Sequence, residues 1–191
     1  MIGGLSDAVG EALEAGVRAI QLREKDLPVR ELLGLALRLR DLTKRWSARL
    51  FINDRVDVAL VCRADGVHLG GQSMPPEAVR RIPGSEKLMI GVSAHSMEQA
   101  AAAQRGGADF ITFGPVFETA SKKAYGAPLG LQRLREAASA LDIPVFAIGG
   151  IKTGNIKSVM EAGAYGAALI SGILGADDIR REASQYVQAL E

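Results

Sequence analysis

The sequence has little of what marks several large classes of protein. Cys62 is the only cysteine, so an intrachain disulfide is excluded, and there is no CxxC pair or other metal-ligand cluster. The formal net charge is only +1, so the overall charge gives no reason to expect nucleic acid or an acidic membrane surface as a partner. Any cations that bind an anionic ligand must therefore be placed locally.

Long apolar runs are also missing. No stretch approaches the roughly 20 apolar residues that cross a bilayer. The N-terminal segment has no basic start of the kind found in signal peptides and carries Asp7, Glu11 and Glu14 instead. From these two absences we expect a cytoplasmic protein.

Glycine is abundant, with 22 residues, whereas aromatic residues make up only 5% of the chain. This balance suits many tight turns between strands and helices. The 191 residues are enough for a single domain, residues 1–191, with a substantial core. We find no linker or low-complexity segment that would divide it.

Short apolar runs alternate with amphipathic stretches along the chain. The runs predict seven buried strands, over residues 17–22, 49–53, 66–69, 88–92, 109–114, 143–148 and 166–170. The amphipathic stretches predict eight helices, over residues 5–15, 28–46, 56–62, 75–82, 96–105, 131–141, 155–162 and 177–190. Ser6 is expected to cap the first helix, and Ser96 with Gln99 to form a capping box.

One helix followed by seven strand–helix units is the rhythm of a parallel α/β fold. The pattern is one strand short of an eight-fold barrel, and the chain begins almost on the first helix. We therefore predict an α/β fold of the (β/α)8 TIM barrel type that lacks its first strand in this chain. An open doubly wound sheet is the alternative, but no nucleotide-binding fingerprint follows the first strand.

Polar residues follow nearly every predicted strand, and parallel strands would bring them to one mouth of the barrel. They are Arg23 and Lys25; Asn53 and Asp54; His68, Gln72 and Ser73; Ser93 and His95; Thr119, Ser121, Lys122 and Lys123; Gly149 and Gly150; and Ser171 and Gly172. Cations and glycine turns at helix starts predict a site for one or more phosphates. A carboxylate among cations makes Asp54 a candidate Mg²⁺ ligand.

Several of these residues also have a structural interpretation. Asn53 and Asp54 are good candidates to cap the helix that follows them. His68 alternates with apolar neighbours, so a structural inward histidine is as well supported as a functional one. His95 precedes Ser96 and is expected to mark a helix start.

Seven stretches together resemble the thiamine-phosphate synthases and their relatives, the thiazole tautomerases. They are residues 21–26, 51–55, 65–70, 90–93, 114–123, 144–151 and Asn155, and residues 170–171 extend the match. The resemblance implies a (β/α)8 barrel. It also implies a reaction that joins hydroxymethylpyrimidine pyrophosphate to thiazole phosphate with release of pyrophosphate.

The resemblance implies roles residue by residue. The pyrophosphate would be held by Arg23, Lys25, Asn53 and Lys122, and Mg²⁺ by Asp54. The aminopyrimidine would lie near Gln21, His68 and Ser93. The thiazole phosphate would be held by Thr119, Ser121, Gly150, Ile170 and Ser171, with Gly149 beside them. The catalytic residues expected from this set are Arg23, Lys25, Ser93 and Lys122.

The sequence departs from the synthase pattern in three places. One is the missing first strand, which removes residues that normally help to close the pyrimidine pocket. The synthases carry a second Mg²⁺-binding aspartate after the His-x-Gly turn, where this chain has Ser73, as in the tautomerase branch. The tautomerase pattern has histidine where this chain has Pro115. Three interpretations therefore stay open, namely a synthase, a tautomerase and a non-catalytic binder of thiamine precursors. The expected partners are small phosphorylated molecules and, as an open alternative, a second copy of the chain, with no nucleic acid and no membrane.

Overall fold

This computed structural model describes residues 2–119 and 127–190 of the chain. Its strands are β1 (Ala19–Leu22), β2 (Arg49–Asn53), β3 (Gly66–Leu69), β4 (Met89–Ala94), β5 (Phe110–Phe113), β6 (Val145–Ile148) and β7 (Gly166–Ala168). Its helices are α1 (Ile2–Glu14), α2 (Val29–Arg45), α3 (Val56–Val61), α4 (Pro76–Val79), α5 (Met97–Arg105), α6 (Gly130–Ala140), α7 (Ile156–Glu161), α8 (Ser171–Leu174) and α9 (Ile179–Leu190). Within the described ranges, no helix has the length and apolar character needed to cross a bilayer.

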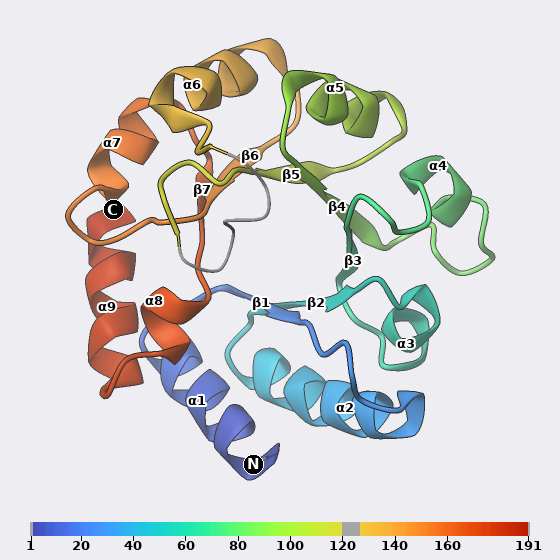
Figure 1. Cartoon of the computed structure of the whole chain (residues 1–191). Coiled ribbons are helices and arrows are strands. Elements are labelled where there is room, and N and C mark those ends of the chain that lie inside the picture. Colours follow the sequence, from blue (N-terminus) through green and yellow to red (C-terminus); the bar gives the residue numbers. More distant parts are fainter. Residues whose placement is uncertain (1, 120–126, 191) are drawn as a thin grey trace.

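The strands form a single parallel sheet in the order of the chain, from β1 to β7. Figure 1 shows the sheet curling round on itself, with the helices on its outer side and α1 beside α9. Within residues 2–119 and 127–190, the backbones of β7 and β1 are not paired with each other. The predicted TIM-barrel-like α/β fold is confirmed. Because all seven strands are parallel, their carboxyl ends meet at one edge of the sheet, as expected.

Alternate residues of the strands point outward and form the core with the helices. Leu50, Ile52, Val67, Ile90 and Ile111 are completely buried. They belong to two apolar clusters, one around β1 to β4 and the other around β4 to β7, which both contact Val92. Removing such a side chain by a Leu→Ala change costs about 2–5 kcal/mol of unfolding free energy. The core therefore fixes which strand residues face the barrel interior.

Phenylalanines paired with glycines fill the barrel interior near its floor. Phe51 lies opposite Gly66 in the sheet register, and Phe110 lies opposite Gly91. A Cβ at Gly91 would lie 2.2 Å from the Phe110 ring. The same pairing recurs between Phe146 and Gly166, and the Phe110 ring makes edge contacts with the rings on both sides. Glycine thus makes room on one strand for the ring of its neighbour.

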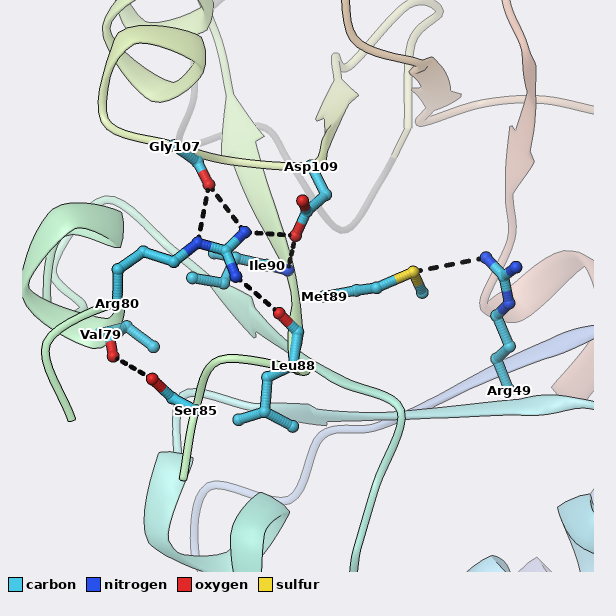
Figure 2. Close-up of polar contacts among 9 residues, drawn as sticks. All are labelled: Arg49, Val79, Arg80, Ser85, Leu88, Met89, Ile90, Gly107 and Asp109. Carbon is cyan, nitrogen blue, oxygen red and sulfur yellow. Dashed lines mark hydrogen bonds and ion pairs between the residues drawn. The ribbon is translucent and has the colours of Figure 1, made fainter. Parts of the chain in front are cut away.

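The amino-terminal edge of the sheet is tied together by arginine–aspartate pairs. Asp109 accepts a hydrogen bond from the Ile90 N–H at 2.6 Å and pairs with Arg80 at 2.6 Å. Figure 2 shows that Arg80 also donates to the carbonyls of Gly107 and Leu88. Each group in this cluster has its hydrogen-bonding partner within the fold, so the cluster is structural.

A second aspartate, two strands earlier, also binds both an arginine and a backbone N–H. The Asp65 carboxylate accepts a hydrogen bond from the Leu50 N–H at 2.7 Å and pairs with Arg40 of α2. Asp65 and Asp109 each directly precede a strand and each bind the backbone of the preceding strand. The repetition shows that charge on this edge serves to hold neighbouring strands and helices in register.

The predicted cap of the first helix is wrong. Helix α1 begins at Ile2, so Ser6 lies inside it, and its buried hydroxyl has no hydrogen-bond partner among residues 2–119 and 127–190. Ser96 does cap α5 by accepting from the Gln99 N–H, while the Gln99 side chain binds the N–H of His95.

The carboxyl-terminal part also differs from expectation. Strand β7 ends at Ala168 instead of residue 170, and an unpredicted helix, α8, begins at Ser171. Earlier in the chain, helix α4 is only four residues long, shorter than the predicted residues 75–82. These segments are too short for periodicity to separate helix, strand and turn.

Candidate active site

The ends of β1 and β2 place the predicted anion-binding residues at the same mouth. Arg23 follows β1 directly, Lys25 lies two residues further, and both side chains are exposed. Asn53 is the last residue of β2, which pairs with β1 in parallel. In the described parts of the chain, neither Arg23 nor Lys25 forms an ion pair. Their charges are therefore available to a ligand.

Asp54 follows β2 in a left-handed backbone conformation, with φ of 68°. Aspartate and asparagine tolerate this conformation better than most residues. Its N–H donates to the His68 carbonyl at 2.9 Å, which fixes it against β3. Its carboxylate is exposed and accepts no hydrogen bond from the described residues. The helix-cap interpretation of Asn53 and Asp54 is wrong, because Arg55 precedes α3 and no side chain caps it.

A neighbouring carboxylate behaves differently from that of Asp54. Asp57 forms a two-pronged pair with Arg55, at 2.9 and 2.5 Å. The hydrogen bond from Arg55 lowers the pKa of the Asp57 carboxyl below its usual range. The same bond, with a smaller contribution from the charge of Asp54, raises the pKa of Arg55. Asp57 is therefore occupied, whereas the carboxylate of Asp54 forms no ion pair with the described residues and is open to a metal.

Two predicted residues meet inside the barrel. Nε2 of His68, on β3, lies 2.9 Å from the Ser93 hydroxyl on β4. His68 is buried, at 4% exposure, and Ser93 is partly exposed. The Thr112 hydroxyl of β5 lies 3.4 Å from both groups and was not predicted as a site residue. Its position between Phe110 and Gly114 in an inward-facing row is the only sequence signal that could have identified it.

Gly149 and Gly150 form a tight turn after β6, but they do not start a helix as predicted. Helix α7 begins at Ile156, and the glycines have φ of 97° and 67°. The turn is locked to the β5 loop by hydrogen bonds from Val116 N–H to Ile148 and from Phe117 N–H to Gly149. A Cβ at Gly150 would lie 2.5 Å from a backbone oxygen, so only glycine fits this turn.

The remaining predicted residues lie around the same mouth where the structure describes them. Gln21 is an exposed residue of β1, and Thr119 lies in the loop after β5. Ile170 directly precedes α8, and Ser171 is the first residue of that helix. The predictions for Ser121 and Lys122 fall on residues 120–126, outside the described residues.

Ser73, the residue in place of the second synthase aspartate, closes a turn after β3. Its hydroxyl accepts a hydrogen bond from the Gly70 N–H at 2.6 Å, and its own N–H donates to the Gly70 carbonyl. Among residues 2–119 and 127–190, no group of three or more histidine, cysteine or acidic side chains is gathered for a metal. A metal at this mouth would therefore need oxygens from its ligand as well as from Asp54.

The comparisons with known proteins agree with this geometry. The sequence profile described as thiamine monophosphate synthase matches residues 3–173. A putative thiamine-phosphate synthase of Geobacter sulfurreducens is 56% identical over 94% of this chain and 84% of its own length. A thiamine-phosphate synthase of Roseiflexus sp. is 47% identical over 91% of this chain and 73% of its own.

Solved structures point the same way. The thiamine phosphate pyrophosphorylase of Pyrococcus furiosus superposes with a TM-score of 0.90 at 40% identity, over 97% of this chain and 88% of its own. The matched region includes every described site residue from Gln21 to Ser171. The chain belongs to the thiamine monophosphate synthase family.

Proposed function

We propose that this protein is a thiamine-phosphate synthase, a transferase that joins hydroxymethylpyrimidine pyrophosphate to thiazole phosphate and releases pyrophosphate. The observation that carries the proposal is a set of exposed charges at the ends of β1 and β2, namely Arg23, Lys25 and Asp54, which form no ion pair with the described residues. Two cations beside one carboxylate suit a pyrophosphate with a divalent metal, because the guanidinium and ammonium bind phosphate oxygens and the carboxylate binds the metal.

Mg²⁺ fits the donors at this mouth. It is commonly held by one or two carboxylates, water and substrate phosphates. Asp54 offers one carboxylate that accepts no hydrogen bond within the described residues, and Asn53 beside it offers an amide oxygen. When bound, the metal would neutralise charge on the departing pyrophosphate.

The residues of the chain divide the remaining work. Arg23 and Lys25 hold and neutralise the leaving pyrophosphate from the β1 side, and the sequence assigns Lys122 the same role. His68 and Ser93 hold the edge of the aminopyrimidine inside the barrel. The turn at Gly149 and Gly150 and the start of α8 hold the thiazole phosphate, together with Thr119. Ser121 is assigned the same role from the sequence alone. Positioning the two substrates in one mouth supplies much of the rate acceleration.

The tautomerase interpretation has less support. Its sequence basis was Ser73, and that hydroxyl has a structural role in the turn at Gly70. An isomerase of a single phosphate also has no need of the Arg23, Lys25 and Asp54 set. Cytoplasmic location, a homodimer, and the lack of nucleic-acid and membrane partners stay predictions from the sequence.

The direct test is turnover by the purified protein. Incubation with hydroxymethylpyrimidine pyrophosphate, thiazole phosphate and Mg²⁺ should yield thiamine phosphate and pyrophosphate in equal amounts. Omission of either substrate, or chelation of Mg²⁺, should abolish both products. Conversion of a thiazole tautomer without formation of thiamine phosphate would instead establish the isomerase.

A further inference from the structure

Three polar side chains on successive strands form a triangle inside the barrel, which we call the His68–Ser93–Thr112 triangle. His68 lies on β3, Ser93 on β4 and Thr112 on β5, and Ser93 is directly opposite Thr112 in the register. The distances are 2.9 Å from His68 Nε2 to Ser93 Oγ and 3.4 Å from Thr112 Oγ1 to each of the other two. Ser93 is the most exposed of the three.

Packing holds the triangle in place. A Cβ at Gly91 would lie 2.6 Å from His68 Nδ1, and the Phe110 ring lies 5.9 Å from the imidazole, measured between centroids. Thr112 is 7% exposed, and its neighbours in sequence, Ile111 and Phe113, are buried on the outer face of the sheet. The imidazole and the threonine hydroxyl are therefore fixed before any ligand arrives.

A count of hydrogen-bonding positions shows what this arrangement leaves open. A serine hydroxyl has one proton and two lone pairs, so it can make three hydrogen bonds. The Thr112 hydroxyl donates to Ser93 and so occupies one lone pair. The bond between Ser93 and His68 Nε2 occupies a second position. Among the described residues nothing fills the third position, and its direction is set by the other two.

We infer that Thr112 is a positioning residue for the pyrimidine substrate, acting through Ser93. Together with His68 it aims the last hydrogen-bonding position of Ser93 at the polar edge of a heteroaromatic ring in the barrel. The inference rests on the proposed function, which supplies the aminopyrimidine as the ring. Thr112 does not itself touch the substrate, so its loss weakens recognition of the ring and leaves recognition of the phosphates unchanged.

The test compares Thr112→Val, which keeps the shape but loses the hydroxyl, with Thr112→Ser, which keeps the hydroxyl. Calorimetry should show that Thr112→Val binds hydroxymethylpyrimidine pyrophosphate about tenfold more weakly, as expected for the loss of one oriented hydrogen bond. Inorganic pyrophosphate with Mg²⁺ should bind equally to both variants and to wild type. Thr112→Ser should restore most of the affinity for the pyrimidine.

A double-mutant cycle with Ser93→Ala separates positioning from general structure. If Thr112 acts through Ser93, Thr112→Val should cause little further loss in the Ser93→Ala background, so the two effects will not add. Full additivity, or equal weakening for pyrimidine and for inorganic pyrophosphate, would overturn the inference. Because binding is measured without turnover, a wild type that binds the pyrimidine and makes no thiamine phosphate refutes the proposed function alone.

Discussion

The two ends of the same parallel strands use charge in opposite ways. At the amino-terminal edge, Asp65 and Asp109 each bind an arginine and a backbone N–H of the neighbouring strand. At the carboxyl-terminal mouth, Arg23 and Asp54 are exposed and form no ion pair with the described residues. Paired charge holds the fold, and unpaired charge at one mouth indicates a ligand. Substitutions at the amino-terminal edge should therefore lower stability, whereas substitutions at the mouth should lower activity.

The largest expected effect is on activity at the mouth. Asp54→Asn keeps a side chain that tolerates the φ of 68° but removes the charge that would hold Mg²⁺. We expect kcat/KM for thiamine phosphate formation to fall roughly 100-fold or more, since metal stabilisation of transition-state charge is worth several kcal/mol. Urea unfolding should change by less than about 0.5 kcal/mol, because the side chain is exposed. A large loss of stability would contradict the view that charge at the mouth serves the ligand and not the fold.

The next effect is on stability at the opposite edge. Asp109→Asn removes the charge that binds Arg80 and the Ile90 N–H. We expect urea unfolding to show a loss of about 1–2 kcal/mol, a value reduced because the Asp109 side chain is 43% exposed. Asp7→Asn, an exposed change on α1, is the matched control and should have almost no effect. If folded Asp109→Asn lost activity as strongly as Asp54→Asn, the purely structural role of Asp109 would be contradicted.

A smaller effect should follow Arg23→Lys. The change keeps the positive charge but loses the planar fork that binds two phosphate oxygens at once. We expect KM for hydroxymethylpyrimidine pyrophosphate to rise about tenfold, with KM for thiazole phosphate unchanged. Steady-state kinetics with each substrate varied in turn will show this. Arg30→Lys, exposed on α2, is the control, and an equal effect there would mean that Arg23 has no specific role.

The smallest effect concerns Asp57, the paired carboxylate beside the mouth. Arg55 lowers its pKa in the folded protein, so the pair stabilises the fold above the unfolded pKa of about 4 and loses this contribution as the pH falls below it. The side chain is 61% exposed, which limits the contribution to about 0.5 kcal/mol. Urea unfolding of wild type and Asp57→Asn should therefore differ slightly at pH 7 and converge in acid. If the difference in unfolding free energy grew as the pH fell, a lowered pKa of Asp57 in the folded protein would be contradicted.

The sequence predicted the barrel because short apolar runs such as β2 alternate with amphipathic helices such as α2. It could not predict the Phe–Gly pairs of the interior, because these depend on register between strands. Thr112 was missed for a related reason. A single threonine in an apolar strand is ordinary, and only the approach of His68 and Ser93 gives it a role.

Local backbone conformation was the other source of error. Asn53 and Asp54 have the residue types of a helix cap, but the left-handed turn at Asp54 frees the carboxylate instead. Ser6 has the residue type of a helix cap, but α1 begins four residues earlier, at Ile2. The glycine turn at Gly149 was recognised, but its attachment to the β5 loop was not, since that contact joins distant parts of the chain.

The most direct test of the account is calorimetric titration of pyrophosphate, with and without Mg²⁺, into wild type, Asp54→Asn and Asp57→Asn. Asp57 is the matched control because it is an aspartate three residues away that is already paired. We predict that Mg²⁺ strengthens pyrophosphate binding in wild type and in Asp57→Asn, and that this gain disappears in Asp54→Asn. An equal gain from Mg²⁺ in all three proteins would contradict the claim that the unpaired charge of Asp54 serves the ligand.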